Sequence, residues 1–158
     1  MAKKSALNSP MSPYDQALKL ATSGEPGGEV EALSLLEQAS SAGDYRATYA
    51  IGTWYLYGKV VRKNARKAIR YFRIAAINGI AEAAFDLAVS YETGVGIRRN
   101  ESMAAAYYLL ALRNGLPDGA VELHRMFYWG IGVLKNRKVA MIFESWGSHD
   151  SRFSENAR

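Results

Sequence analysis

The sequence lacks cysteine and contains only two histidines among its 158 residues. The absence of thiols excludes disulfide bridges, thiolate zinc sites and cysteine nucleophiles, and it fits a reducing compartment. The longest nearly unbroken apolar run, 103–112, is shorter than the roughly 20 residues that a membrane helix needs. The first 13 residues include two lysines with no apolar stretch behind them. We therefore expect a cytoplasmic protein without membrane insertion.

Motifs for catalysis are also scarce. The Gly-x-Gly stretches at 94–96 and 130–132 do not continue into a dinucleotide-binding or Walker pattern, which favours structural loops over a nucleotide site. His124 and His149 have no acidic or histidine neighbours at a ligand spacing. No nucleophile-elbow motif is present. The sequence thus predicts no enzyme and no bound cofactor or metal.

An internal repeat of 36 residues is the main positive feature of the sequence. Glycine, asparagine, alanine, aliphatic and aromatic columns all share this one register. The columns are Gly43/79/115, Gly58/94/130, Asn64/100/136, Ala68/104/140, Ile51/Leu87/Leu123, Tyr55/Tyr91/Phe127 and Tyr71/Tyr107/Phe143.

Each unit contains two segments with helical spacing of apolar residues. The asparagine column suits the N-cap of each second helix, and a glycine follows that helix at a position that favours left-handed backbone. An all-α protein is therefore predicted, with helices near 14–22, 29–42, 44–57, 64–78, 80–93, 100–114, 116–129 and 136–147.

The two strings that carry the repeat resemble the Sel1-like repeat, a relative of the tetratricopeptide repeat. They read Ala47-x3-Ile51-Gly52-x2-Tyr55-x2-Gly58 and Asn64-x3-Ala68-x2-Tyr71-Phe72-x2-Ala75-Ala76-x2-Gly79. The resemblance implies a right-handed α-solenoid of about four antiparallel helix pairs. It divides the chain into a flexible start (1–12), a repeat domain (13–147) and a flexible tail (148–158). The repeat domain then comprises an atypical opening pair (13–43) and repeats 44–79, 80–115 and 116–147.

The sequence departs from the repeat pattern at two informative positions. The first full unit has Val60 where the others have the second glycine of Gly-x-Gly. Because valine tolerates a positive φ poorly, this loop is predicted to take another path. His124 stands where Gly52 and Ala88 stand in the other units, which predicts looser packing of the third helix pair.

The same resemblance implies a concave groove formed by the first helix of each pair. Such a groove suits a protein partner, since Tyr, Trp and Arg are frequent hot-spot residues. The alternative for any one of these aromatic residues is packing between repeats. The implied groove residues are Arg46, Tyr49, Tyr57, Glu82, Phe85, Glu92, Asp118, Arg125, Tyr128 and Trp129.

Charge is unevenly distributed along the chain, whose net charge is +5. Residues 15–44 contain six acids and one lysine, whereas residues 45–81 contain eight bases and no acid. Aligned bases should form a ridge beside the N-termini of the second helices, where the helix dipoles add to the positive potential. Either this ridge attracts a partner or it only keeps the protein soluble. We call it the basic edge: Arg62, Lys63, Arg66, Arg98, Arg99, Lys135 and Lys138.

These features predict a non-catalytic adaptor or scaffold that binds a protein partner through the groove, the basic edge or both. One alternative is a bacterial immunity protein that neutralises an acidic toxin or secreted effector. A nucleic-acid binder is less favoured, because the aromatic face also carries Glu82, Glu92 and Asp118. At the C-terminal end, Met141, Ile142, Phe143 and Trp146 have no following helix to cover them. We therefore expect a second copy, the partner or the folded-back tail to cover that end.

Overall fold

The computed structural model describes residues 11–153, and the side chains of residues 11–147. This part of the chain forms eight α-helices and no strand, which confirms the all-α prediction. The helices are α1 (Pro13–Ser23), α2 (Gly28–Ser41), α3 (Tyr45–Tyr57), α4 (Ala65–Ile77), α5 (Ala81–Thr93), α6 (Glu101–Arg113), α7 (Asp118–Trp129) and α8 (Arg137–Phe153).

The helix ends follow from the repeated polar and glycine columns. The side chains of Asn64 and Asn100 accept hydrogen bonds from the backbone N–H groups of Lys67 and Met103, both at 3.0 Å, and Asn136 does the same for α8. These contacts satisfy amides that the first helical turn leaves without a partner. The glycines after α2, α4 and α6 have φ values of 90°, 94° and 100°, the left-handed backbone that ends those helices.

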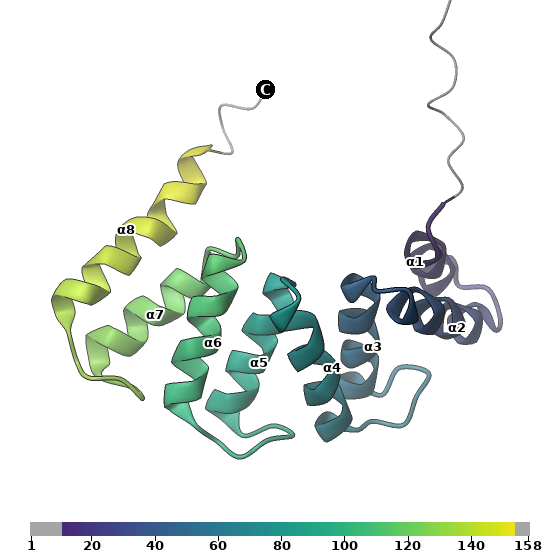
Figure 1. Cartoon of the computed structure of the whole chain (residues 1–158), viewed down its shortest axis with the longest axis horizontal. Coiled ribbons are helices and arrows are strands. Elements are labelled where there is room, and N and C mark those ends of the chain that lie inside the picture. The colour runs from purple at the N-terminus through teal and green to yellow at the C-terminus, as the bar shows by residue number, and fades with distance from the viewer. Residues whose placement is uncertain (1–10, 154–158) are drawn as a thin grey trace, which may run out of the picture.

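Consecutive helices pack as pairs, and the pairs stack in a row that bends into an arch (Figure 1). Each full unit repeats the same interior. Ile51, Leu87 and Leu123 are at most 2% exposed. A stacked ring pair joins the two helices of each unit, with centroid distances of 5.7, 5.4 and 5.6 Å for Tyr55/Tyr71, Tyr91/Tyr107 and Phe127/Phe143.

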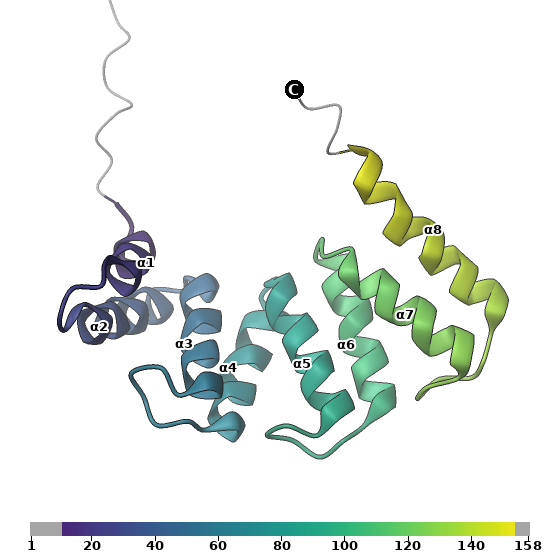
Figure 2. The same cartoon turned by 180° about the vertical axis from the view of Figure 1, so that it is seen from behind.

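Side chains from different repeats show which side of the arch is concave. Tyr14 of α1, Ile80 before α5 and Leu116 before α7 line one cavity, although a whole repeat lies between them in the sequence. The short turns and the N-terminal ends of α3, α5 and α7 therefore converge on the inner side. The longer loops 58–64, 94–100 and 130–136 lie on the outer side, as Figures 1 and 2 show.

The prediction that the Val60 loop takes another path is wrong. Val60 has φ 62°, close to the 73° of Gly96 and the 65° of Gly132. A Cβ on Gly96 would lie 2.6 Å from the carbonyl oxygen of Ala65, the first residue of α4, so a side chain cannot fit there. Val60 instead borders a cavity of about 450 Å³ that Glu29 and other residues at the start of α2 also line. The valine side chain has room, and the strained backbone conformation is retained.

The surroundings of His124 differ from those of Gly52, and looser packing of the third helix pair stays a prediction. In the first full unit a Cβ on Gly52 would lie 2.7 Å from the ring of Phe72. In the third unit Glu144 occupies the position equivalent to Phe72 and is exposed, so no ring competes for the space. The half-buried His124 ring stacks on Tyr128, and its Nδ1 lies 3.0 Å from the carbonyl oxygen of Ala140.

The last helix continues beyond its predicted end at residue 147 and reaches Phe153. Of the predicted flexible segments 1–12 and 148–158, residues 1–10 and 154–158 lie outside the described part of the chain, and residues 148–153 belong to α8. Trp146 is 53% exposed, but its equivalent Ile74 is 46% exposed in α4, so this column faces solvent elsewhere too. Met141 differs, because its equivalents Ile69 and Ala105 are buried. Coverage of this end by a second copy, by the partner or by the folded-back tail stays a prediction.

Candidate protein-interaction surface

Two of the implied groove residues pack largely inward. The Tyr49 ring lies 5.6 Å from that of Phe72, and the Phe85 ring lies 5.1 Å from that of Tyr108. Both Tyr49 and Phe85 are only half-buried, so an edge of each ring still reaches the surface. Their substitution would change the stability of the fold as well as any binding.

Two other aromatic residues assigned to the concave groove are freely exposed, and they lie at the ends of α3 and α7 next to the outer loops (Figure 1). Tyr57 ends α3 and is 77% exposed, and Trp129 ends α7 and is 64% exposed. Tyr128 is half-buried, because it contacts the rings of His124 and Trp129 and because the guanidinium of Arg137 lies 5.1 Å from its ring centroid. Among the implied groove residues, Tyr57 and Trp129 are thus the large rings that a partner could cover without disturbing the core.

The inner side of the arch contains a cavity of about 450 Å³. It brings together the implied groove residues Arg46, Tyr49 and Glu82. The Arg46 guanidinium is already held, since it donates two hydrogen bonds to Asp44 (3.0 and 2.6 Å) and lies 4.4 Å from the Tyr14 ring centroid. The sequence reasoning missed Tyr14, Ile80 and Leu116, which also line this cavity. These three residues come from different repeats and meet only because the repeats stack on one another.

A polar network links the middle of the implied groove. The Tyr108 hydroxyl donates to Glu92 at 3.0 Å, and Arg125 donates to Glu92 at 2.7 Å and to Glu122 at 2.8 Å. Burial and the neighbouring carboxylate raise the pKa of Tyr108. Arg125 and Glu92 therefore act as a bridge between α7 and α5. Asp118 takes no part in this network, and it lies exposed in the first turn of α7.

A second pair of tyrosine and carboxylate joins α3 to α5. The Tyr49 hydroxyl donates to Asp86 at 3.0 Å. Burial raises the pKa of the half-buried Asp86 carboxyl group, and the negative charge of Glu82 raises it further. Asp86 also lines a cavity of about 350 Å³ between the ends of α3 and α5, together with Tyr57 and Lys63.

All seven residues of the basic edge are exposed. Five of them belong to the three long loops: Arg62, Lys63, Arg98, Arg99 and Lys135. The other two, Arg66 and Lys138, lie in the first turns of α4 and α8. The three loops follow one another along the outer side of the arch (Figure 1). Within the described residues, Arg99 is the one member of the edge that forms an ion pair, with Glu101.

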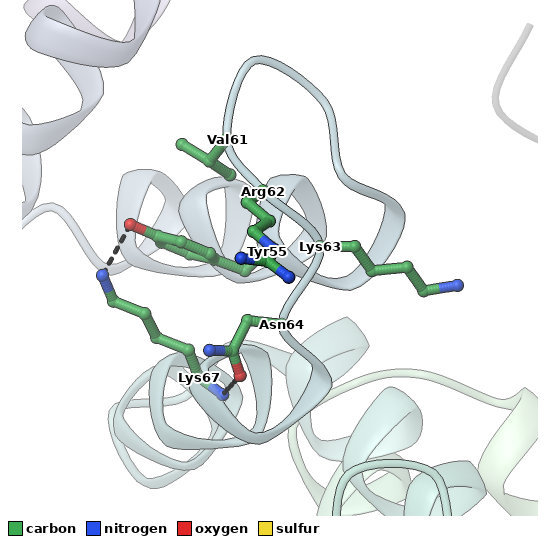
Figure 3. Close-up of a pocket in the computed structure, with 6 residues that line it drawn as sticks. All are labelled: Tyr55, Val61, Arg62, Lys63, Asn64 and Lys67. Carbon is green, nitrogen blue, oxygen red and sulfur yellow. Dashed lines mark hydrogen bonds between the residues drawn. The ribbon is translucent and has the colours of Figure 1, made fainter.

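The first loop of the basic edge also borders a hollow of about 620 Å³, shown in Figure 3. Lys67 spans it and donates to the Tyr55 hydroxyl at 2.6 Å. Lys63 extends away from Lys67, on the other side of the loop (Figure 3). It is there that Lys63 lines the cavity with Tyr57 and Asp86. The implied groove and the basic edge therefore meet at Lys63.

Other kinds of site find no support in residues 11–153. No described helix combines the length and the apolar character needed to cross a membrane. The described residues also contain no cluster of three or more histidine or acidic side chains that could hold a metal ion.

The repeated helix pairs, the asparagine caps and the Gly-x-Gly loops match the Sel1 repeat over residues 23–44, 46–80, 81–116 and 120–143. The chain belongs to the Sel1 repeat family. Sel1 repeats form helical solenoids that typically serve as protein-interaction scaffolds. No protein among those with curated descriptions matches the sequence significantly.

Solved structures of Sel1-like repeat proteins have the same fold. One is a protective antigen from uropathogenic Escherichia coli strains, with 21% identity and a TM-score of 0.81 over 87% of this chain and 30% of that protein. A Sel1 repeat protein from Oxalobacter formigenes has 28% identity and a TM-score of 0.78 over 85% and 54%. Cysteine-rich protein B of Helicobacter pylori has 25% identity and a TM-score of 0.57 over 78% and 92%. The chain thus spans less than two thirds of the first two proteins.

Proposed function

We propose that this Sel1 repeat protein is a non-catalytic adaptor whose partner protein binds along α3, α5 and α7 and extends onto the basic edge. The exposure of Tyr57 and Trp129 carries this proposal. Large exposed aromatic side chains beside a basic rim are typical of binding surfaces, and burial of such rings by a partner yields much of the binding free energy.

The basic edge contributes in a different way. Exposed charges add little affinity, but their combined field attracts a partner of opposite sign and speeds association. Among the described residues, six of the seven members of the basic edge form no ion pair, so their charges have no direct partner to neutralise them. An acidic partner protein, such as the toxin or effector considered above, would be attracted by this edge.

The experiment is capture of the partner from the source cells on the immobilised protein, followed by titration with the purified partner. Trp129→Ala and Tyr57→Ala should each weaken binding by about 1 to 4 kcal/mol, because a hot-spot ring is lost. Ile77→Ala is the matched control, since Ile77 is 70% exposed but ends α4, away from the proposed surface. Equal affinity of all three variants and the wild type would refute the proposed surface.

A second set of variants tests the basic edge. Reversing Arg62, Lys63 and Arg66 to glutamate should slow association and flatten its dependence on salt concentration. Capture that disappears after nuclease treatment would instead indicate a nucleic-acid ligand. Inhibition of the purified partner's toxic activity by the wild-type protein would identify the immunity role.

A further inference from the structure

The repeat allows the surroundings of α5 to be compared on its two sides. Positions 36 residues apart are equivalent, so Arg125 and Glu122 of α7 correspond to Val89 and Asp86 of α5. Likewise, Glu92 of α5 corresponds to Leu56 of α3. The side chains between α5 and α7 can therefore be compared, position by position, with those between α3 and α5.

At the α5/α7 junction an arginine occupies the space between the helices. The Arg125 guanidinium donates through Nη2 to Glu92 (2.7 Å) and through Nε to Glu122 (2.8 Å). Arg125 is only 37% exposed in its side chain, so its stem is largely covered. The carboxylate of Glu122 thus has a cation beside it, supplied by a residue one turn further along the same helix.

At the α3/α5 junction the cation is missing. Val89 carries no charge, and a cavity of about 350 Å³ remains, lined by Leu56, Tyr57, Asp86, Val89 and Val95 among others. One oxygen of Asp86, Oδ2, accepts the hydrogen bond from Tyr49. No described residue donates to Oδ1 or forms an ion pair with Asp86.

The surroundings of Asp86 favour a positive ligand. A half-buried carboxylate without a cation is costly, and its raised pKa reflects both that burial and the negative charge of Glu82. The nearby positive residue is Lys63, an exposed residue of the loop before α4 that lines the same cavity. Lys63 therefore lowers the affinity for an isolated cation without neutralising Asp86.

We propose that this cavity receives an arginine side chain of the partner protein, whose guanidinium binds Asp86 as Arg125 binds Glu122. The stem of that arginine would lie against Tyr57, Val89 and Val95, which form the apolar part of the cavity. Arginine suits the site better than lysine, because its planar group can bind a carboxylate through two N–H groups and stack on an aromatic ring. This inference rests on the proposed function and names one residue type in the partner.

The test titrates the full chain with acetyl-arginine amide and follows the backbone amide signals by NMR. Val89, Ser90 and Thr93 should shift on addition of the probe. Acetyl-norleucine amide, which has a similar stem without the guanidinium, should shift them at least fivefold less at equal concentration. Asp86→Asn should weaken binding of acetyl-arginine amide at least fivefold, whereas Lys63→Gln should strengthen it.

Val89→Arg is the decisive variant, because it places on α5 the arginine that α7 already has. It should fill the cavity and abolish the shifts caused by acetyl-arginine amide. Ile77→Arg adds the same charge on the exposed end of α4 and should leave them unchanged. A dispersed amide spectrum in each variant confirms that the chain is folded.

Three results would overturn the inference: no shift with acetyl-arginine amide, equal shifts with acetyl-norleucine amide, or undiminished shifts in the Val89→Arg variant. Its failure is distinguishable from failure of the proposed function. If the captured partner still depends on Trp129 while the arginine probe does not bind, the adaptor role stands without the arginine site. If the probe binds but no partner depends on Trp129, the cavity is real and the proposed surface is wrong.

Discussion

Replacement of Gly96 by alanine tests how closely consecutive repeats approach one another. Gly96 has φ 73°, and a Cβ there would lie 2.6 Å from the carbonyl oxygen of Ala65. Gly94, two residues earlier, has φ 82°, but its Cβ would find no atom nearer than 3.6 Å. The two glycines therefore share the left-handed backbone and differ in the contact with the preceding repeat.

The expected change in the free energy of unfolding of each variant follows from this difference. In both variants, the left-handed conformation costs alanine about 1 to 2 kcal/mol, and reduced freedom of the unfolded chain returns about 0.4 to 1 kcal/mol. Gly96→Ala alone must also displace backbone atoms of α4, which adds about 1 to 3 kcal/mol by analogy with overpacked interiors. We therefore expect Gly96→Ala to be less stable than Gly94→Ala by about 1 to 3 kcal/mol.

Urea unfolding followed by far-ultraviolet circular dichroism measures both variants. The slope of the unfolding free energy against urea should stay that of the wild type, so that the midpoints report stability directly. Equal midpoints for Gly94→Ala and Gly96→Ala would refute the close approach of the loop to α4.

Three further outcomes are expected from the same measurement. Phe72→Ala should cost about 3 to 5 kcal/mol, because the Phe72 ring is fully buried. Val60→Gly should raise the midpoint slightly or leave it unchanged, since relief of about 1 to 2 kcal/mol of backbone strain exceeds the roughly 0.5 to 1 kcal/mol entropic cost of glycine; a clear loss of stability would contradict the strain. The raised folded-state pKa of Asp86 means that its contribution to stability is present at low pH and is lost as pH rises through that pKa. The stability of Asp86→Asn relative to the wild type should therefore increase with pH, and a decrease would contradict the desolvation of Asp86.

The sequence by itself determined the repeat and the helix ends that carry a repeated cap, but not the end of α8. Asn64 and its equivalents cap helices because a short polar side chain can accept from the first free amides, and this depends only on neighbouring residues. The glycines after α2, α4 and α6 end those helices for an equally local reason. The recurrence of Tyr55 and Tyr71 at 36-residue intervals was also readable, whereas the stacking of their rings came from the structure.

Only the tertiary structure decided what each surface position faces. Val60 keeps its strained backbone because the start of α2 leaves space beside it, and that space depends on how the opening helix pair packs. Tyr49 and Trp129 looked alike in the implied groove, yet one packs on Phe72 and the other is exposed. The cavity at Asp86 arises from contacts between residues more than 20 positions apart, such as Tyr57 and Asp86, and such contacts depend on the angles and separations at which helices stack.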